Sequence, residues 1–485
     1  MIRGPVDDGE TPAPMFLAMT AANGSPALWS LNRQAEAIRD RKISSRELLD
    51  EYLSRIERIN PGLNAVVTLD SGPASEAAAR ADEETANRKE ERGPLHGLPV
   101  TIKDAIETAG IRSTGGAREL SNHVPANDAL AVSRLKSAGA IVFGKTNAPR
   151  WSGDIQTFND LFGTTNNPWD HARTPGGSSG GAAASVAAGL TSFELGTDIG
   201  GSVRIPSHFC GVFGLKPSFG VVPQKGYLDR VGGGLIDADI NVFGPLARSA
   251  GDLVTLLEVL GGPSGEDAKA WRLHLPPARH GDIRDYRIGT WLDDPAGEVD
   301  AEVGDALSAA VEALAKAGAK VSESRPPIRL SEAVALFTSL ITPAISVSTD
   351  KQTGDAISGT HRTWLDNHQS RTQMRSVWSE WFQEFDVLLC PVTPMAAFPH
   401  DHSGTIVDRN LIINGRSRPH IDTLSWTGLV GVVYLPSTVA PVGFTRGGLP
   451  VGIQVVGPYL EDRTPLFVAA EIEALLGGYV PPPEA

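Results

Sequence analysis

The segment GTDIGGSVR, residues 196–204, places Ser202 directly after two glycines, with Asp198 before them and Arg204 after. A serine that attacks a carbonyl carbon needs open space, and nearby backbone N–H groups can stabilise the resulting oxyanion. The same residues also fit a tight turn in which glycine supplies positive φ values. This segment alone therefore leaves a nucleophile and a structural turn as alternatives.

Two earlier segments add residues that such a nucleophile would need. LHGLPVTIKD (95–104) predicts a short strand with Lys103 near its end. RTPGGSSGG (173–181) predicts a loop that contains two adjacent serines, Ser178 and Ser179. Ser178 lies 75 residues after Lys103 and 24 residues before Ser202.

In this order and at these spacings the three segments resemble the amidase signature family. The match runs almost unbroken from about residue 93 to 218 and is looser in the N-terminal helices and after residue 245. The resemblance implies one large α/β/α domain with a twisted mixed central sheet covered by helices. It assigns residues 26–485 to that domain, with the catalytic core at about 93–218, the substrate pocket mostly at 245–485, and a flexible tail at 1–25.

The resemblance also assigns roles by position. It implies a general base, Lys103, a bridging serine typically held by a cis peptide bond, Ser178, and an acylating nucleophile, Ser202. The implied oxyanion hole consists of the backbone N–H groups of Ile199, Gly200, Gly201 and Ser202. The residues expected to support the lysine and the nucleophile loop are Ser179, Asp198 and Arg204. No cofactor-binding or metal-binding residues are expected.

The chemistry of these residues is coherent in itself. A serine hydroxyl is a poor nucleophile until a base removes its proton. Lysine serves as that base only when neutral, which requires a pKa well below its usual value of about 10.4. Burial beside Val100 and Ile102 would lower the pKa in this way. Ser178 could then relay the proton from Ser202 to Lys103 and return it to a leaving amine.

Two other motifs match catalytic or binding patterns but lack the structural context. Gly139–Thr146 satisfies the phosphate-loop pattern GxxxxGK[ST], yet its middle residues AIVF read as a strand where a loop is required. Gly176–Gly180 satisfies the nucleophile-elbow pattern GxSxG, which needs an apolar strand before it. The polar segment NNPWDHARTP precedes it instead.

The elements that must position these residues alternate along the chain, which predicts an α/β fold. Ser44 and Glu47 have capping-box spacing at the start of a helix expected to end at residues 60–62. Expected strands are 65–69, 98–104, 140–144, 193–196, 286–292, 320–324, 386–391 and 450–457. Further expected helices are 74–91, 128–138, 180–190, 301–317, 330–345 and 372–384. Loops are expected at 262–283 and 393–420. The uncharged stretch 423–445 contains two prolines and three glycines, so it predicts a buried strand–turn–strand and not a membrane span.

Composition narrows the location and the partners. The 485 residues are 41% hydrophobic and 21% charged, which is ordinary for a globular protein, and the net charge is −14. We therefore expect no nucleic-acid partner. Cys210 and Cys390 lie in apolar segments, which fits buried thiols in a reducing compartment. The N-terminal residues are acidic, and MFLAM is too short for a signal-peptide core, so we expect a cytoplasmic protein.

The sequence departs from the family pattern at two places. Arg150 stands where glutamate is frequent, and Ala182 stands where serine is common. Both affect the expected substrate and neither is a catalytic position. Aromatic residues that could form the core or line an apolar pocket are Trp364, Trp378, Trp381, Phe398, Trp426 and Tyr434.

The leading hypothesis is a serine hydrolase that cleaves carboxamide C–N bonds through an acyl-enzyme on Ser202. Its expected partner is a small-molecule amide or carbamate, with esters also considered, and a homodimer is left open. A second hypothesis is the glutamine-hydrolysing component of a tRNA-dependent amidotransferase. The third is a nonenzymatic nucleotide-binding protein that uses Gly139–Thr146.

Overall fold

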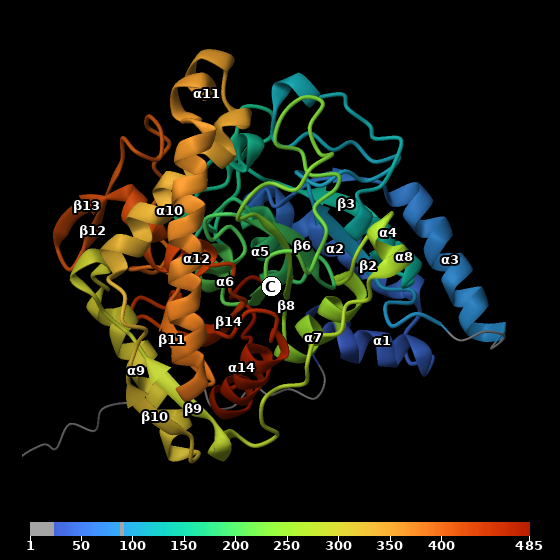
Figure 1. The fold of residues 1–485 in the computed structure, drawn as a ribbon. Helices are drawn as coiled ribbons and strands as arrows, with labels where there is room; N and C mark the ends of the chain where they lie inside the picture. The colour runs from blue at the N-terminus through green and yellow to red at the C-terminus, as the bar shows by residue number, and fades with distance from the viewer. Residues whose placement is uncertain (1–23, 88–91) are drawn as a thin grey trace, which may run out of the picture.

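The computed structural model describes residues 24–87 and 92–485 (Figure 1). Most of the predicted N-terminal tail and the end of the predicted 74–91 helix lie outside these residues. The strands are β1 (Val66–Leu69), β2 (Pro99–Lys103), β3 (Ile141–Thr146), β4 (Phe158–Asn159), β5 (Gly163–Thr164), β6 (Glu194–Asp198), β7 (Phe213–Lys216), β8 (Val242–Ala247), β9 (Arg287–Thr290), β10 (Lys320–Glu323), β11 (Val387–Pro391), β12 (Asn410–Ile413), β13 (Arg416–Pro419), β14 (Ser437–Phe444) and β15 (Pro450–Val456). The helices are α1 (Leu31–Arg39), α2 (Ser45–Leu63), α3 (Ser71–Asn87), α4 (Leu130–Ser137), α5 (Gly180–Ala187), α6 (Arg204–Cys210), α7 (Ala250–Leu260), α8 (Asp267–Ala270), α9 (Ala301–Lys316), α10 (Leu330–Ile345), α11 (Lys351–Ile357), α12 (His361–Glu384), α13 (Ser425–Gly431) and α14 (Arg463–Leu476).

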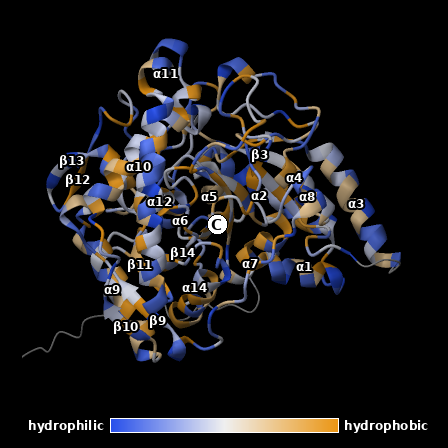
Figure 2. Ribbon diagram, viewed as in Figure 1, coloured by the Kyte–Doolittle hydropathy of each residue, from blue (hydrophilic) through white to orange (hydrophobic). Residues whose placement is uncertain are grey.

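A mixed sheet of eight strands forms the centre, in the order β10-β9-β11-β15-β14-β7-β8-β6. β9 pairs in parallel with β10 and β11, and the other pairs are antiparallel. α14 packs against both α7 and α9, and all three helices pack against the sheet. α5 and α6 pack against each other and against the sheet. α12 lies in front of the sheet, and much of it consists of hydrophilic residues, shown in blue in Figure 2. The prediction of an α/β fold with a mixed, helix-covered sheet is confirmed.

The edges of two sheets meet at the candidate site. β1, β3 and β2 form a separate sheet with β2 at its edge, and β6 is the edge strand of the large sheet. The hydroxyl of Thr101 on β2 donates to the carboxyl group of Glu194 on β6. Lys103 Nζ, two residues further along β2, donates to Thr197 Oγ1 on β6 at 2.8 Å. Side chains therefore join the two edges and place Lys103 at the junction.

The first long helix begins as predicted and ends later. Ser44 and Glu47 form the capping box of α2. Pro61 lies inside the helix, which continues to Leu63 and ends at Asn64 in a left-handed conformation. The side-chain oxygen of Asn60 accepts the N–H groups of the two residues after Asn64, at 2.8 and 2.9 Å. This side-chain cap ends the helix two residues after the proline.

Three predictions for the C-terminal half were wrong in part. The first half of 423–445 is the helix α13, whose seven residues are all buried, and only the second half is a strand, β14. A helix satisfies its own backbone hydrogen bonds inside the core, and a short apolar run does not distinguish it from a strand. α12 begins at His361, not at 372, because Thr360 caps it. The predicted loops contain α8 and the hairpin β12–β13.

One described helical stretch, Leu330–Ser348, is apolar and long enough to cross a membrane by length and composition alone. It comprises α10 and the turn that follows, and α10 packs against α12 and α13. Less than a third of its most apolar window is buried. Phe337 and Leu340 lie in the core, whereas Ile345 and Val347 are exposed.

Candidate active site

Lys103 is fully buried and has hydroxyl groups around its ammonium group. Its Nζ donates to Ser178 Oγ at 2.6 Å, to Thr197 Oγ1 at 2.8 Å and to Ser179 Oγ at 3.0 Å. Ser178 and Ser179 immediately precede α5, and the Gly177–Ser178 peptide bond is cis. The structure therefore brings Lys103 together with both serines of the second motif.

Burial changes the proton affinity of this lysine. It lowers the pKa of Lys103 to about 7, and the negative charges of Asp198 and Glu194 oppose the shift. Burial also raises the pKa of Glu194 to about 7. A lysine with a pKa near neutrality is partly unprotonated at physiological pH, so Lys103 is able to accept a proton from a neighbouring hydroxyl.

The loop that carries Ser202 is folded around Asp198. The Asp198 carboxylate accepts the backbone N–H of Gly201 at 2.9 Å and that of Val203 at 3.1 Å. It also pairs with Arg204 through Nη2 at 2.8 Å and Nε at 3.0 Å, and both side chains are fully buried. Burial alone would raise the pKa of Asp198, but the charge and hydrogen bonds of Arg204 hold it below its usual value.

This arrangement affects the predicted oxyanion donors. The N–H of Gly201 donates to Asp198, whereas no described group accepts a hydrogen bond from the N–H of Ile199, Gly200 or Ser202. Gly201 has φ +117°, and a Cβ there would lie 2.8 Å from Thr427, so this position requires glycine. The loop thus leaves three of the four predicted N–H groups without an acceptor among the described residues.

Ser202 adjoins the serine loop through the backbone. Its carbonyl accepts the N–H of Ser179 at 3.1 Å, and the residue is 6% exposed. Within the described residues the hydroxyls of Ser202 and Ser178 are not hydrogen-bonded to each other. Hydrogen bonds between catalytic groups often form or shorten only in the complex with substrate. The absence of this bond is therefore compatible with proton transfer between the two serines.

Sequence reasoning missed three residues that shape the site. Thr197 bonds to Lys103, Thr427 donates from its hydroxyl to the carbonyl of Gly200 at 2.7 Å, and the amide oxygen of Gln454 accepts from Arg204 at 2.8 Å. Thr197 lies inside the quoted GTDIGGSVR segment, but its role depends on the junction of β2 with β6. Thr427 and Gln454 come from more than 220 residues further along the chain, and no local pattern marks them.

The buried ion pair gives a stability prediction. Replacing Arg204 by methionine (Arg204→Met) leaves the buried Asp198 carboxylate without its charge partner, so the free energy of unfolding should fall by about 3–5 kcal/mol. Denaturant unfolding measures this change. Arg46→Met breaks an exposed pair with Asp50, and the expected loss is only about 0.5 kcal/mol. Equal losses in the two variants would contradict the assigned role of Arg204.

The segment that matches the phosphate-loop pattern, Gly139–Thr146, has a structural role. Residues 141–146 form β3 and are all buried, and Lys145 donates to Thr108 Oγ1 at 2.8 Å and to the carbonyl of Ile106. Its ammonium group is therefore held inside the protein and does not face a phosphate. Of the aromatic residues named above, Trp378 and Trp426 are core residues, and Trp364 is only partly buried.

The chain is similar to known proteins along most of its length. The family model described as Amidase matches residues 47–360 and 335–466. The chain is 33% identical over 479 residues to one of the subunits of the glutamyl-tRNA(Gln) amidotransferase of Roseiflexus sp. (strain RS-1), covering 90% of this chain and 94% of the relative. It is 30% identical over 465 residues to an acylamidase of Rhodococcus erythropolis, covering 92% and 95%. The solved structure of a bacterial aryl acylamidase of the amidase signature family superposes with a TM-score of 0.82 at 26% identity, covering 93% and 97%.

The fold and these relatives define an amide hydrolase, an enzyme that acts on carbon–nitrogen bonds. The chain belongs to the amidase signature family.

Proposed function

We propose that this protein is a free-standing amidase in which Lys103, Ser178 and Ser202 carry the reaction. The observation that supports the proposal most directly is the fully buried lysine, whose Nζ lies 2.6 Å from Ser178 Oγ. In the proposed mechanism neutral Lys103 takes a proton from Ser178 while Ser178 takes one from Ser202. Ser202 Oγ then bonds to the substrate carbonyl carbon.

The remaining steps use the same groups. The free N–H groups of Ile199, Gly200 and Ser202 would stabilise the negatively charged oxygen of the tetrahedral intermediate. As the C–N bond breaks, Lys103 returns its proton through Ser178 to the leaving amine. Water then attacks the ester on Ser202 by the same proton relay, which releases the acid and restores the serine.

The surroundings of Gly200 support an apolar substrate. The atoms nearest to a Cβ at Gly200 would be Ile341 Cδ1 and Phe337 Cζ at 3.6 Å and Leu424 Cδ1 at 3.7 Å. Two of these side chains, Ile341 and Phe337, come from α10. A substrate group next to the reacting carbonyl would meet these side chains, which favours aryl or alkyl amides, with the corresponding carbamates and esters as further candidates.

The main alternative is glutamine hydrolysis within an amidotransferase, which the 33% identical relative supports. The two functions differ in their requirements. A free-standing amidase cleaves an aryl or alkyl amide without any partner, whereas the alternative predicts preference for glutamine and dependence on partner proteins. Ammonia release and amine release by the purified chain, measured side by side, distinguish them.

The sheet supports treating residues 26–485 as one domain. Strands from residues 194–247 and from residues 287–456 share the eight-stranded sheet. The nucleophile loop and α10 therefore belong to one folded unit, with the apolar side chains of the C-terminal half facing Gly200.

Replacement of Ser178 tests the relay. Ser178→Ala should lower kcat/KM for an anilide by about 10²–10⁴-fold, because the leaving amine needs a proton. The matched aryl ester should lose less, since its attack by Ser202 also uses the relay but its phenoxide leaves without protonation. Ser185→Ala is the control because Ser185 is also buried and its hydroxyl has no hydrogen-bond partner within the described residues. Equal losses for the amide and the ester would count against the relay.

A further inference from the structure

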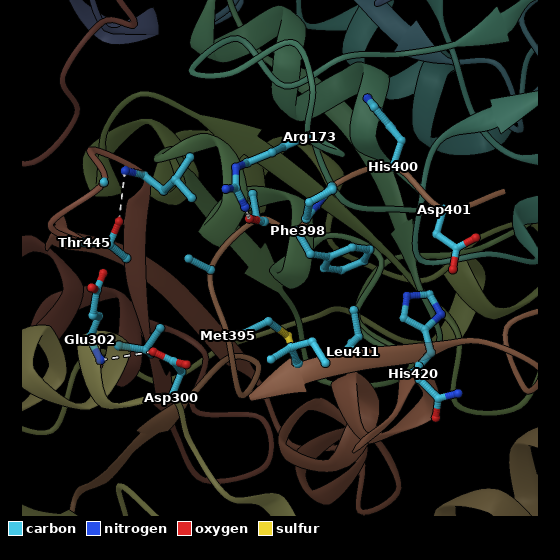
Figure 3. A pocket seen from close by; sticks show the side chains of 18 residues that line it. Arg173, Asp300, Glu302, Met395, Phe398, His400, Asp401, Leu411, His420 and Thr445 are labelled. Carbon is cyan, nitrogen blue, oxygen red and sulfur yellow. Dashed lines mark hydrogen bonds between the residues drawn. The ribbon is translucent and has the colours of Figure 1, made fainter. Parts of the chain in front are cut away.

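The loop before Ser178 is bound on one side by a segment from the C-terminal half. The N–H of Thr174 donates to the carbonyl of Phe398 at 3.0 Å, and Arg173 Nη1 donates to the carbonyl of Ala397 at 2.8 Å. Figure 3 shows Arg173 close to Phe398 at the wall of a cavity of about 640 Å³, with Asp401 further along the same wall. The C-terminal segment therefore fixes the start of the serine loop.

Residues 154–157, here called the backing segment, lie against the other side of the loop. A Cβ at Gly177 would lie 2.7–2.8 Å from backbone atoms of Asp154, Ile155 and Gln156. The hydroxyl of Thr157 donates to the carbonyl of Gly176 at 2.9 Å and accepts the N–H of Gly180 at 3.1 Å. The backing segment thus touches the residues on both sides of Ser178.

The C-terminal segment that binds the serine loop, residues 397–409, also holds the backing segment in place. Arg409 pairs with the Asp154 carboxylate through two hydrogen bonds of 2.8 and 3.0 Å. The Arg409 side chain is 1% exposed and that of Asp154 is 12% exposed. Gln156 adds two hydrogen bonds to the backbone of Asp401, at 2.6 and 3.1 Å. Arg409 itself is fixed because its Nε donates to the carbonyl of Ser403 at 2.8 Å.

We propose that Arg409 is a positioning residue for Ser178. Its bidentate pairing with Asp154 holds the backing segment against Gly176 and Gly177. The loop in turn fixes the position of Ser178 Oγ between Lys103 Nζ and the substrate. Arg409 has no direct contact with Lys103 or Ser202 within the described residues and acts through the loop. This inference rests on the proposed relay function of Ser178.

The expected consequence is selective. A buried guanidinium–carboxylate pair is directional, so its loss lets the backing segment and the loop shift. A misplacement of about 1 Å can cost on the order of 100-fold when a group must reach a reacting atom. Proton delivery to the leaving amine depends on Ser178, whereas expulsion of a phenoxide does not. Loss of Arg409 should therefore impair amide cleavage more than ester cleavage.

The test compares Arg409→Met with Arg279→Met in the full-length protein. Arg279 is a matched control because it also pairs with a carboxylate through two hydrogen bonds, to Glu461 at 2.6 and 2.9 Å, and also donates to a backbone carbonyl. We expect Arg409→Met to lower kcat/KM for an anilide at least tenfold and for the matched aryl ester by a clearly smaller factor. Arg279→Met should leave the ratio of amide to ester activity unchanged.

A conservative variant keeps the test valid if Arg409→Met does not fold. Arg409→Lys retains the charge but not the planar fork, so it should shift the amide-to-ester ratio in the same direction by a smaller factor. A ratio equal to that of the wild type in the folded variants, or parallel losses of both activities, overturns the positioning role. Ser178→Ala is assayed alongside: if it shifts the ratio and the Arg409 variants do not, only the positioning role fails. If Ser178→Ala itself leaves the ratio unchanged, the relay has failed.

Discussion

Replacing Ser202 by alanine should lower kcat/KM for amide hydrolysis by on the order of 10⁴-fold or more, because the variant has no hydroxyl at the proposed nucleophile position. The fold should remain intact. Ser202 is 6% exposed, its hydroxyl makes no hydrogen bond within the described residues, and alanine differs from serine only by that oxygen. We therefore expect the free energy of unfolding to change by less than about 1 kcal/mol.

Covalent labelling identifies the nucleophile independently of turnover. A fluorophosphonate should modify the wild type once, and peptide mapping by mass spectrometry should place the adduct on Ser202. Ser202→Ala should not be labelled, whereas Ser178→Ala should still carry the adduct on Ser202. An adduct on Ser178 or Ser179 in the wild type would show that the nucleophile has been assigned to the wrong serine.

The residues proposed for catalysis could be named from the sequence because three short segments carry them and together resemble the amidase signature family. Lys103, Ser178 and Ser202 each lie in a segment whose glycines, serines and strand pattern are visible locally. The structure adds what spacing does not reveal, the meeting of β2 with β6. That junction gives Lys103 its third hydroxyl partner, Thr197, and lies beside the buried carboxyl group of Glu194.

Contacts over long sequence distances account for most of what the sequence did not predict. Thr427 supports the carbonyl of Gly200 from 227 residues away, and Arg409 reaches Asp154 across 255 residues. Neither has a local signature, because each contributes one side chain to a site whose other parts come from distant strands. The wrongly predicted first half of 423–445 has a different cause, since its apolar residues fit a buried helix and a buried strand equally well.

The contacts of Asp198 decide which backbone N–H groups near Ser202 have no hydrogen-bond acceptor. The sequence places four consecutive donors before and at Ser202, but Asp198 curls the loop so that its carboxylate takes the N–H of Gly201. Arg204 holds that carboxylate ionised and in place. The ion pair therefore fixes the carboxylate that accepts the N–H of Gly201, and this contact could not be read from the motif.

Lys103→Met should lower kcat/KM for amides by about 10²–10⁴-fold and remove its pH dependence. In the wild type kcat/KM should rise with pH through the pKa of Lys103, about 7, and then level off, because only the neutral amine accepts a proton. Methionine keeps an unbranched side chain of similar length but has no basic nitrogen. Lys216→Met is the matched control: burial lowers the pKa of Lys216 to about 7 as well, but its Nζ donates to the carbonyls of Pro217 and Leu435, so the activity profile should persist.

Folding stability should respond to the same ionisation with a defined sign. Between the folded-state pKa of about 7 and the ordinary value of 10.5, the unfolded state binds more protons at Lys103 than the folded state does. This group therefore makes the free energy of unfolding rise with pH across that window, by up to about 1.4 kcal/mol per pH unit. Below pH 7 both states are protonated, and the wild type carries the full cost of burying the charge. Glu194 also titrates near pH 7, so the comparison uses denaturant unfolding of the wild type and Lys103→Met above that value. The free energy of unfolding of the wild type minus that of Lys103→Met should therefore rise with pH. Lys103 is not the base if kcat/KM of the wild type does not rise with pH, or if Lys103→Met hydrolyses amides at a near-normal rate.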